Sequence, residues 1–155
     1  AREAVKHAKY CPQGERGFGY SRACAHGIDF YDYIKKANKE TSVIVQIEHK
    51  QAIENLDEIL QVKGIDGTFI GPMDLSGSMN VTGNMSHPKV KTALKKYFKS
   101  SEKYNVPTGT QVIRPDKKSI KKAVNQGYKM IVLGLDTVFL DESSERHLEF
   151  AETLK

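Results

Sequence analysis

Residues 43–48 read Val-Ile-Val-Gln-Ile-Glu, a short apolar run that turns polar on one face at its end. Three similar runs follow, and longer segments with helical spacing of apolar residues separate them. These runs are Gly67–Gly71, Thr108–Ile113 and Met130–Leu135. Short strands that alternate with helices in this way predict βα units with parallel strands, so the sequence indicates the α/β class.

The expected helices follow the strands. The first covers residues 52–60, and the second covers 90–104 and opens at Ser86-His87-Pro88, because proline favours the first helical position. The third covers 120–124 and is ended by Gly127. The last covers 139–154, and we expect a break in it near Glu142-Ser143-Ser144.

Two parallel folds compete for this pattern, an open doubly wound sheet and a (β/α)₈ barrel. No G-x-G-x-x-G motif follows a strand, since Gly17-Phe18-Gly19 precedes all of them, and the dinucleotide-binding fold loses its main support. A barrel needs eight strands and about 250 residues. The 155 residues supply four strands, so we predict one partial TIM-barrel domain over residues 1–155 that lacks its N-terminal βα units.

Composition excludes several classes. A hydrophobic content of 39% with 28% charged residues is typical of a globular protein, and without a long apolar stretch we expect no membrane partner. The net charge of +5 comes mainly from lysines, which solvated helix faces explain better than nucleic-acid binding. Two cysteines, Cys11 and Cys24, suit a reducing cytoplasm and favour neither a disulfide nor a zinc site.

Polar residues that could bind a ligand lie at the carboxyl end of the first strand. Gln46 and Glu48 share one face because side chains alternate along a strand. Active sites of parallel barrels lie at this carboxyl end, and a buried carboxylate there needs a cation or another strong partner. A salt bridge to arginine or lysine is the structural alternative for Glu48.

A second carboxylate follows the next strand, in Gly71-Pro72-Met73-Asp74-Leu75-Ser76. One βα unit separates Asp74 from Glu48, so we expect both at one rim, as an oxygen site suited to Mg²⁺ or Mn²⁺. The structural alternative for Asp74 is a helix N-cap over Leu75 and Ser76.

These motifs resemble the HpcH/HpaI aldolase family. The resemblance covers nearly the whole chain. It includes 12–19 (PQGERGFG), 45–48 (VQIE), 69–76 (FIGPMDLS), His87-Pro88 and 134–137 (GLDT). In that family the motif glutamate and aspartate bind a divalent metal (Mg²⁺, Mn²⁺ or Co²⁺), which implies this role for Glu48 and Asp74.

The resemblance also implies a substrate site. The motif glutamine touches the bound pyruvate, which implies the same for Gln46, and the backbone at Met73 and Asp74 would hold the pyruvate carboxylate. Arg16, in a loop that we expect to fold over the site, could meet an anionic substrate, although a structural role is an equal alternative.

The same resemblance implies that this is the C-terminal part of a barrel, about strands 5–8. The family's general-base histidine, its partner aspartate and a pyruvate-binding arginine lie in the portion that this sequence lacks. We therefore assign no catalytic residue to this chain. Met73 stands where a small residue is common in the family, and Gln111 where an apolar one is usual, so both could reshape the pocket.

The implied activity is that of a carbon–carbon lyase, a metal-dependent aldolase that reversibly cleaves a 2-keto-4-hydroxy acid to pyruvate and an aldehyde. A half-barrel leaves exposed strand edges and an uncovered core, so we expect a homo-oligomer. The alternatives are a catalytically inactive fragment or pseudo-enzyme that acts as a structural or assembly module, and a nucleic-acid-binding protein that acts through its lysines.

Overall fold

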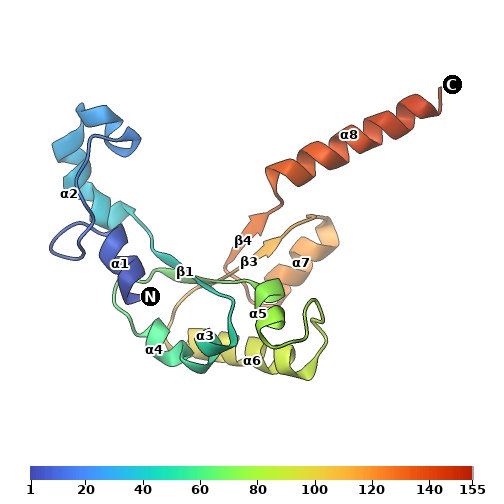
Figure 1. Cartoon of the computed structure of the whole chain (residues 1–155), viewed down its shortest axis with the longest axis horizontal. Helices are drawn as coiled ribbons and strands as arrows, with labels where there is room; N and C mark the ends of the chain where they lie inside the picture. The colour runs from blue at the N-terminus through green and yellow to red at the C-terminus, as the bar shows by residue number, and fades with distance from the viewer. Residues whose placement is uncertain (155) are drawn as a thin grey trace. The chain divides into compact units, whose positions relative to one another are not determined.

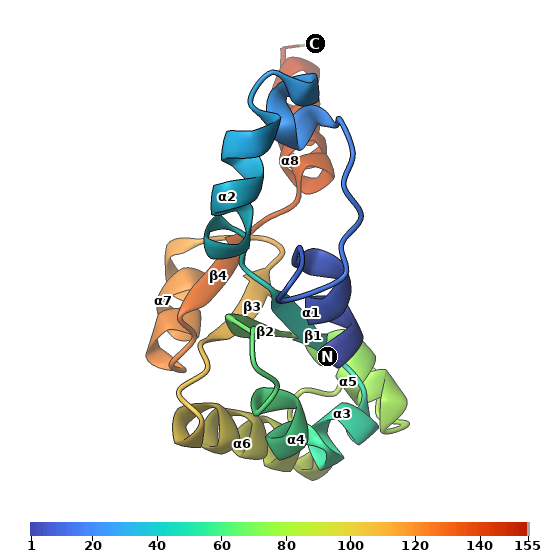
Figure 2. The same cartoon turned by 90° about the vertical axis from the view of Figure 1, so that its left-hand side faces the viewer.

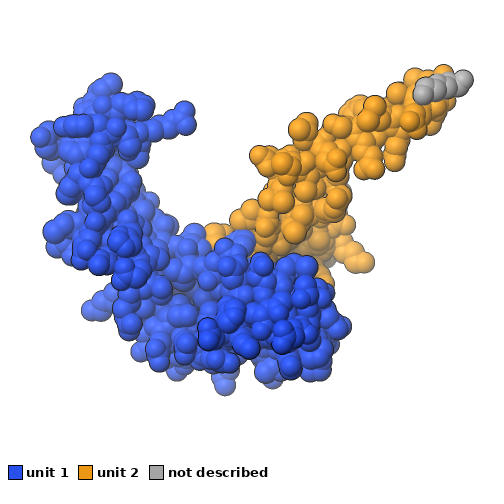
Figure 3. Space-filling view, viewed as in Figure 1, with its two compact units in different colours: residues 1–107 blue, residues 108–155 orange. Residues whose placement is uncertain are grey.

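The computed structural model describes residues 1–154 and divides into two compact units. The first runs from Ala1 to Pro107 and the second begins at Thr108 (Figure 3). No helix among the described residues is both long and apolar enough to cross a membrane. Each unit contains one pair of parallel strands.

The first unit opens with three helical segments. These are α1 (Arg2–Ala8), the 3₁₀ segment η1 (Arg22–Gly27) and α2 (Phe30–Glu40). Lys9 is buried, and its Nζ donates hydrogen bonds to the main-chain oxygens of Asn38, at 2.8 Å, and Thr41. Both carbonyls lie at the end of α2, where a cation offsets the negative end of the helix dipole. Lys9 thereby ties the chain after α1 to the end of α2.

Strands β1 (Ile44–Ile47) and β2 (Gly67–Ile70) pair in parallel, with Gln46 opposite Phe69 and Ile47 opposite Ile70. At the start of the pair, the N–H of Val43 donates to Asp66 Oδ2 at 2.7 Å, and the N–H of Asp66 donates to the Val43 carbonyl at 2.9 Å. These two bonds fix the register, which decides the side chains that meet at the carboxyl end.

Helices α3 (Lys50–Glu54), α4 (Leu56–Leu60) and α6 (Pro88–Lys103) lie together on one side of this pair (Figures 1 and 2). Helix α5 (Pro72–Ser78) follows β2 directly. The core beneath the strands is apolar, and its fully buried members include Ile47, Leu56, Ile70, Leu75, Val90 and Tyr97. A buried polar pair in this core links Thr68 Oγ1 of β2 to the Tyr97 hydroxyl of α6 at 2.9 Å.

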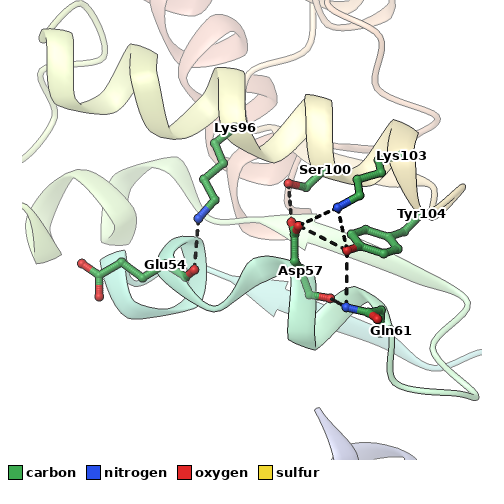
Figure 4. Close-up of polar contacts among 7 residues, drawn as sticks. All are labelled: Glu54, Asp57, Gln61, Lys96, Ser100, Lys103 and Tyr104. Carbon is green, nitrogen blue, oxygen red and sulfur yellow. Dashed lines mark hydrogen bonds and ion pairs between the residues drawn. The ribbon is translucent and has the colours of Figure 1, made fainter.

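Asp57 joins α4 to the end of α6 (Figure 4). Its carboxylate accepts hydrogen bonds from Ser100 Oγ at 2.7 Å, Lys103 Nζ at 3.0 Å and the Tyr104 hydroxyl at 3.2 Å. The bond from Ser100 and then that from Lys103 lower the pKa of Asp57, because both favour its charged form. A second link joins Lys96 Nζ to the Glu54 carbonyl at 3.0 Å.

The second unit contains β3 (Thr108–Val112), α7 (Lys117–Asn125), β4 (Met130–Leu133) and α8 (Asp136–Glu152). Strands β3 and β4 are parallel, with Gly109 opposite Met130. Asp116 and Ser119 form a reciprocal capping box that starts α7. Helix α8 extends away from the rest of this unit and has no buried residue (Figure 1).

The structure confirms four strands, each within two residues of its predicted ends, and helices where α6 and α7 lie. Two predictions were wrong in detail. The helix expected over residues 52–60 is split at Asn55, and α8 is continuous through Glu142–Ser144, where we expected a break. Serine is an adequate helix former, so this dipeptide alone does not end a helix.

We expect Asp57→Asn to lower the free energy of unfolding at pH 7. We also expect this free energy to decrease less in the variant than in the parent as the pH is lowered. A carboxylate whose pKa is lowered by folding contributes stability above its unfolded value, near 3.8, and loses it as pH falls through the lower folded value. Urea unfolding at several pH values measures this. Asp29→Asn, at an exposed N-cap whose side chain makes no capping bond, is the matched control. Identical acid profiles for Asp57→Asn and the parent would contradict it.

Candidate metal centre

Gln46 and Glu48 come together at the carboxyl end of β1. Gln46 Nε2 donates a hydrogen bond of 2.6 Å to Glu48 Oε2, which confirms that the two side chains share a face. Gln46 is exposed and Glu48 is half-buried. Glu48 forms no ion pair among the described residues, so the salt-bridge alternative has no support there. The hydrogen bond from the Gln46 side-chain amide orients one carboxylate oxygen of Glu48 and leaves the other available.

Asp74 lies in the first turn of α5 and is exposed. The alternative that it caps this helix was wrong, because the N-cap is Gly71 and no side chain makes a capping bond there. Glu48 and Asp74 line the same cavity of about 530 Å³. The cavity is completed by His49, Met73, Gly77, Ser78 and Thr82. The two carboxylates predicted at one rim therefore do share one open cavity.

Gly71 makes this arrangement possible, and the sequence analysis did not single it out. Its N–H donates to the Ile47 carbonyl at 3.1 Å, which extends the strand pairing by one step and sets Gly71 beside Glu48. A Cβ at this position would lie 2.9 Å from Glu48 Cβ and 3.1 Å from Gln46 Nε2. Only glycine leaves room for both side chains in these positions.

Two serines that the sequence analysis also missed brace the cavity. Ser78 Oγ accepts the N–H of Lys50 at 2.9 Å and so joins the start of α3 to the end of α5. Ser76 is buried, and its Oγ donates to the Met73 carbonyl and accepts the N–H of Gly83, which holds the loop that carries Thr82. His49 caps α3 by accepting the N–H of Gln51 at 3.2 Å.

The donor set suits a hard divalent cation. Within residues 1–154, no three side chains of His, Cys, Asp or Glu lie close enough together to hold a metal ion. Mg²⁺ and Mn²⁺ do not need such a cage, because Mg²⁺ is commonly bound by one or two carboxylates while water and substrate complete its shell. Two accessible carboxylates at one cavity fit that mode.

Of the other candidate residues, Arg16 does not line this cavity and Met73 does. The Arg16 guanidinium lies 4.8 Å from the centre of the Tyr10 ring and is not part of the wall of the Glu48–Asp74 cavity. In the second unit, Gln111 Nε2 donates to the Gly134 carbonyl at 3.2 Å. Met73 is more than half exposed at the cavity wall, so its side chain is free to contact a bound molecule.

Comparison with known proteins gives a family. The model of the HpcH/HpaI aldolase/citrate lyase family matches residues 1–142. The chain belongs to this family. It is 37% identical over 146 residues to a 4-hydroxy-2-oxo-heptane-1,7-dioate aldolase of Escherichia coli, with 94% of the chain covered. A 2-keto-3-deoxy-L-rhamnonate aldolase of E. coli O1:K1 / APEC is 35% identical over 149 residues, with 96% covered.

Solved structures agree with this assignment. An HpcH/HpaI aldolase from Desulfitobacterium hafniense DCB-2 superimposes on 97% of the chain with a TM-score of 0.80 and 30% identity. A family protein from Burkholderia cenocepacia J2315 gives 0.84 with 28% identity over the same share. The chain covers 58% and 60% of these two structures, and it spans 55% of both curated relatives. The fold is therefore part of a TIM barrel.

We expect Gly71→Ala to weaken Mn²⁺ binding by about tenfold or more, the usual size of an effect from a group that orients a metal ligand. The cause is steric, because the backbone of Gly71 has a φ of −100°, which alanine also adopts. Titration calorimetry measures the affinity. Gly19→Ala is the control, since a Cβ there meets nothing within 4 Å. Unchanged Mn²⁺ affinity in Gly71→Ala would show that this contact does not position Glu48.

Proposed function

We propose that this chain is the metal-binding part, about strands 5–8 of the barrel, of a metal-dependent aldolase. The reaction is reversible retro-aldol cleavage of a 2-keto-4-hydroxy acid to pyruvate and an aldehyde. The observation that carries the proposal is that Glu48 and Asp74, from two successive βα units, line one cavity while Gln46 orients Glu48. Family membership supplies the reaction class, and because the chain spans about 55% of its relatives, the activity stays a proposal.

Glu48 and Asp74 would hold the divalent ion, which is Mg²⁺, Mn²⁺ or Co²⁺. When bound, such an ion supplies Lewis-acid stabilisation of negative charge on the oxygen of a 2-keto acid. Gln46 keeps one Glu48 oxygen engaged, so the carboxylate is already oriented for binding. The remaining N–H and the carbonyl oxygen of Gln46 are then available to the substrate.

The main chain at Met73 and Asp74 would bind the pyruvate carboxylate. Leu75 donates the first hydrogen bond of α5, to the Gly71 carbonyl at 2.9 Å. The N–H groups of Met73 and Asp74 precede that bond, so the helix leaves them available to a ligand. The Met73 side chain would then border the aldehyde half of the substrate. We keep Arg16 as a candidate contact to an anionic substrate, although in this structure it stacks on Tyr10.

We also propose that the protein is a homo-oligomer, and α8 supports this. The helix exposes Leu140 by 71%, Leu148 by 66% and Phe150 by 64%. Burying a side chain of this size contributes about 2 kcal/mol, so a surface that covers several of them gains substantial stability. A second copy of the chain is the simplest source of such a surface.

The alternative function is an inactive structural or assembly module, and calorimetry separates the two. Titration of the Mn²⁺-loaded protein with oxalate, a mimic of the pyruvate enolate, should give saturable binding of oxalate that is lost when Mn²⁺ is omitted. Oxalate binding that needs no Mn²⁺, or no binding at all, favours the module.

We expect Glu48→Gln and Asp74→Asn each to lower metal-dependent kcat/KM of the intact protein by at least about a hundredfold. Each change removes an anionic ligand while it keeps the shape of the side chain. Pyruvate release from 4-hydroxy-2-oxo acids measures it. Glu58→Gln, an exposed residue of α4, is the control. Full activity of either site variant at saturating Mg²⁺ or Mn²⁺ would refute the metal site.

We expect Leu148→Glu combined with Phe150→Glu to shift the protein to smaller species. Leu148 and Phe150 are two residues apart and point to different sides of α8, so new carboxylates there cannot be buried against a partner without a large desolvation cost. Light scattering coupled to gel filtration gives the mass, and Glu149→Gln on the same turn is the control. A mass that does not change would mean that α8 takes no part in assembly.

A further inference from the structure

A second cavity, of about 590 Å³, lies between α3 and α6 and has no part in the chemistry above. Lys50, Ile53 and Glu54 line it from α3, Met79 and Asn80 follow α5, and Pro88, Lys89, Thr92, Ala93 and Lys96 line it from α6. Residues 89, 92, 93 and 96 have the spacing i, i+3, i+4, i+7, so one face of α6 forms a continuous wall. Ligand pockets of small organic molecules have volumes in this range.

The floor of this cavity is apolar. Ile53 and Ala93 are 6% and 4% exposed, and Met79 is half-buried. The Thr92 hydroxyl and the Asn80 amide add uncharged polar groups. An apolar floor favours a ligand with a hydrocarbon body over a small inorganic ion, because the ion would gain nothing from these walls.

The rim is positively charged. Lys50, Lys89 and Lys96 contribute three ammonium groups, against one carboxylate from Glu54. None of the three lysines forms an ion pair within residues 1–154. Figure 4 shows that the Glu54 carboxylate points away from Lys96, whose Nζ bonds instead to the Glu54 carbonyl at 3.0 Å. That bond uses one of the three N–H groups of Lys96 and leaves two for a ligand.

The rest of helix α6 also carries an excess of positive charge. It carries six lysines, at positions 89, 91, 95, 96, 99 and 103, and a single acid, Glu102. This excess of positive charge raises the local concentration of anions at the surface of the helix. Main-chain amides contribute little, because Pro88 has no N–H and His87 Nδ1 accepts that of Lys89. Recognition must therefore come from the lysine side chains.

We propose that this cavity binds an amphipathic organic anion, a carboxylate carried on an aliphatic or aromatic body. The body rests on Ile53, Met79 and Ala93, and the carboxylate lies among Lys50, Lys89 and Lys96. This site is separate from the Glu48–Asp74 cavity and does not depend on a metal. The two cavities are joined at one point, where the N–H of Lys50, which lines this cavity, donates to Ser78 Oγ, which lines the other, at 2.9 Å.

Phenylbutyrate is the probe, and phenylbutanol and phenylbutylamine carry the same hydrocarbon body with a neutral and a cationic end. We expect phenylbutyrate to shift the NMR methyl signals of Ile53 and Ala93 in the whole protein without added metal. It should bind about tenfold or more tightly than the alcohol, as expected for a charge-assisted hydrogen bond. The amine should not bind. Equal affinity for acid and alcohol, or shifts confined to other methyl groups, would overturn the proposal.

Two variants test the residues. Lys89→Gln with Lys96→Gln should weaken phenylbutyrate binding by about tenfold or more. Lys95→Gln, on the same helix but outside the cavity, should leave it nearly unchanged. Thr92→Trp, at an exposed position of the cavity wall, should block binding by filling the space without disturbing the core. Thermal unfolding confirms that each variant is folded. If Lys95→Gln weakens binding as much as the double variant, only the general charge of α6 is involved and the proposal fails.

Discussion

The register of the β1–β2 pair is the constraint on which the candidate site depends. Reciprocal hydrogen bonds between Val43 and Asp66 set it at one end, and the bond from Gly71 to Ile47 extends it at the other. A slip of one residue would turn Gln46 and Glu48 into the apolar interior and bring Ile47 to the cavity. Glu48 and Asp74 line one cavity because the backbone pairing sets both residues at the same end of the strands.

Part of the fold and of the candidate site could be predicted from the sequence, and part could not. The parallel strands, and the position of Glu48 and Asp74 at one cavity, follow from period-two alternation and from the place where parallel strands end. The role of Gly71 depends on a close approach between two strands, which no local pattern encodes. The same holds for Ser76 and Ser78, whose hydroxyls act across loops that are distant in sequence.

The helices show a similar division. Helix α6 was predicted because Pro88 and a long apolar face mark it clearly. Helix α2 was not predicted, although Phe30, Tyr33, Ile34 and Ala37 have the helical spacing i, i+3, i+4, i+7. It precedes the first strand, so the strand–helix alternation does not require it. The split between α3 and α4 at Asn55 was missed for a different reason, because the apolar spacing continues through it. Hydrophobic periodicity reports which face is buried, but it does not report whether the backbone bends.

The two cavities of the first unit differ in the chemistry that they offer. The Glu48–Asp74 cavity presents acids at the carboxyl end of the strands, and the α3–α6 cavity presents lysines between outer helices. The loop and helix termini that brace one also border the other, because Ser78 bonds to Lys50. An anion and a cation could thus be held on opposite sides of the same short segments without competing for the same groups.

Helix α8 has 17 residues and none of them is buried. Isolated helices of this length are marginal in water, since their hydrogen bonds alone barely offset the entropy of ordering the backbone. In the homo-oligomer proposed above, the helical state of this segment would be coupled to assembly, and its melting temperature would rise with protein concentration. At high dilution the C-terminal segment would then lose its helical structure.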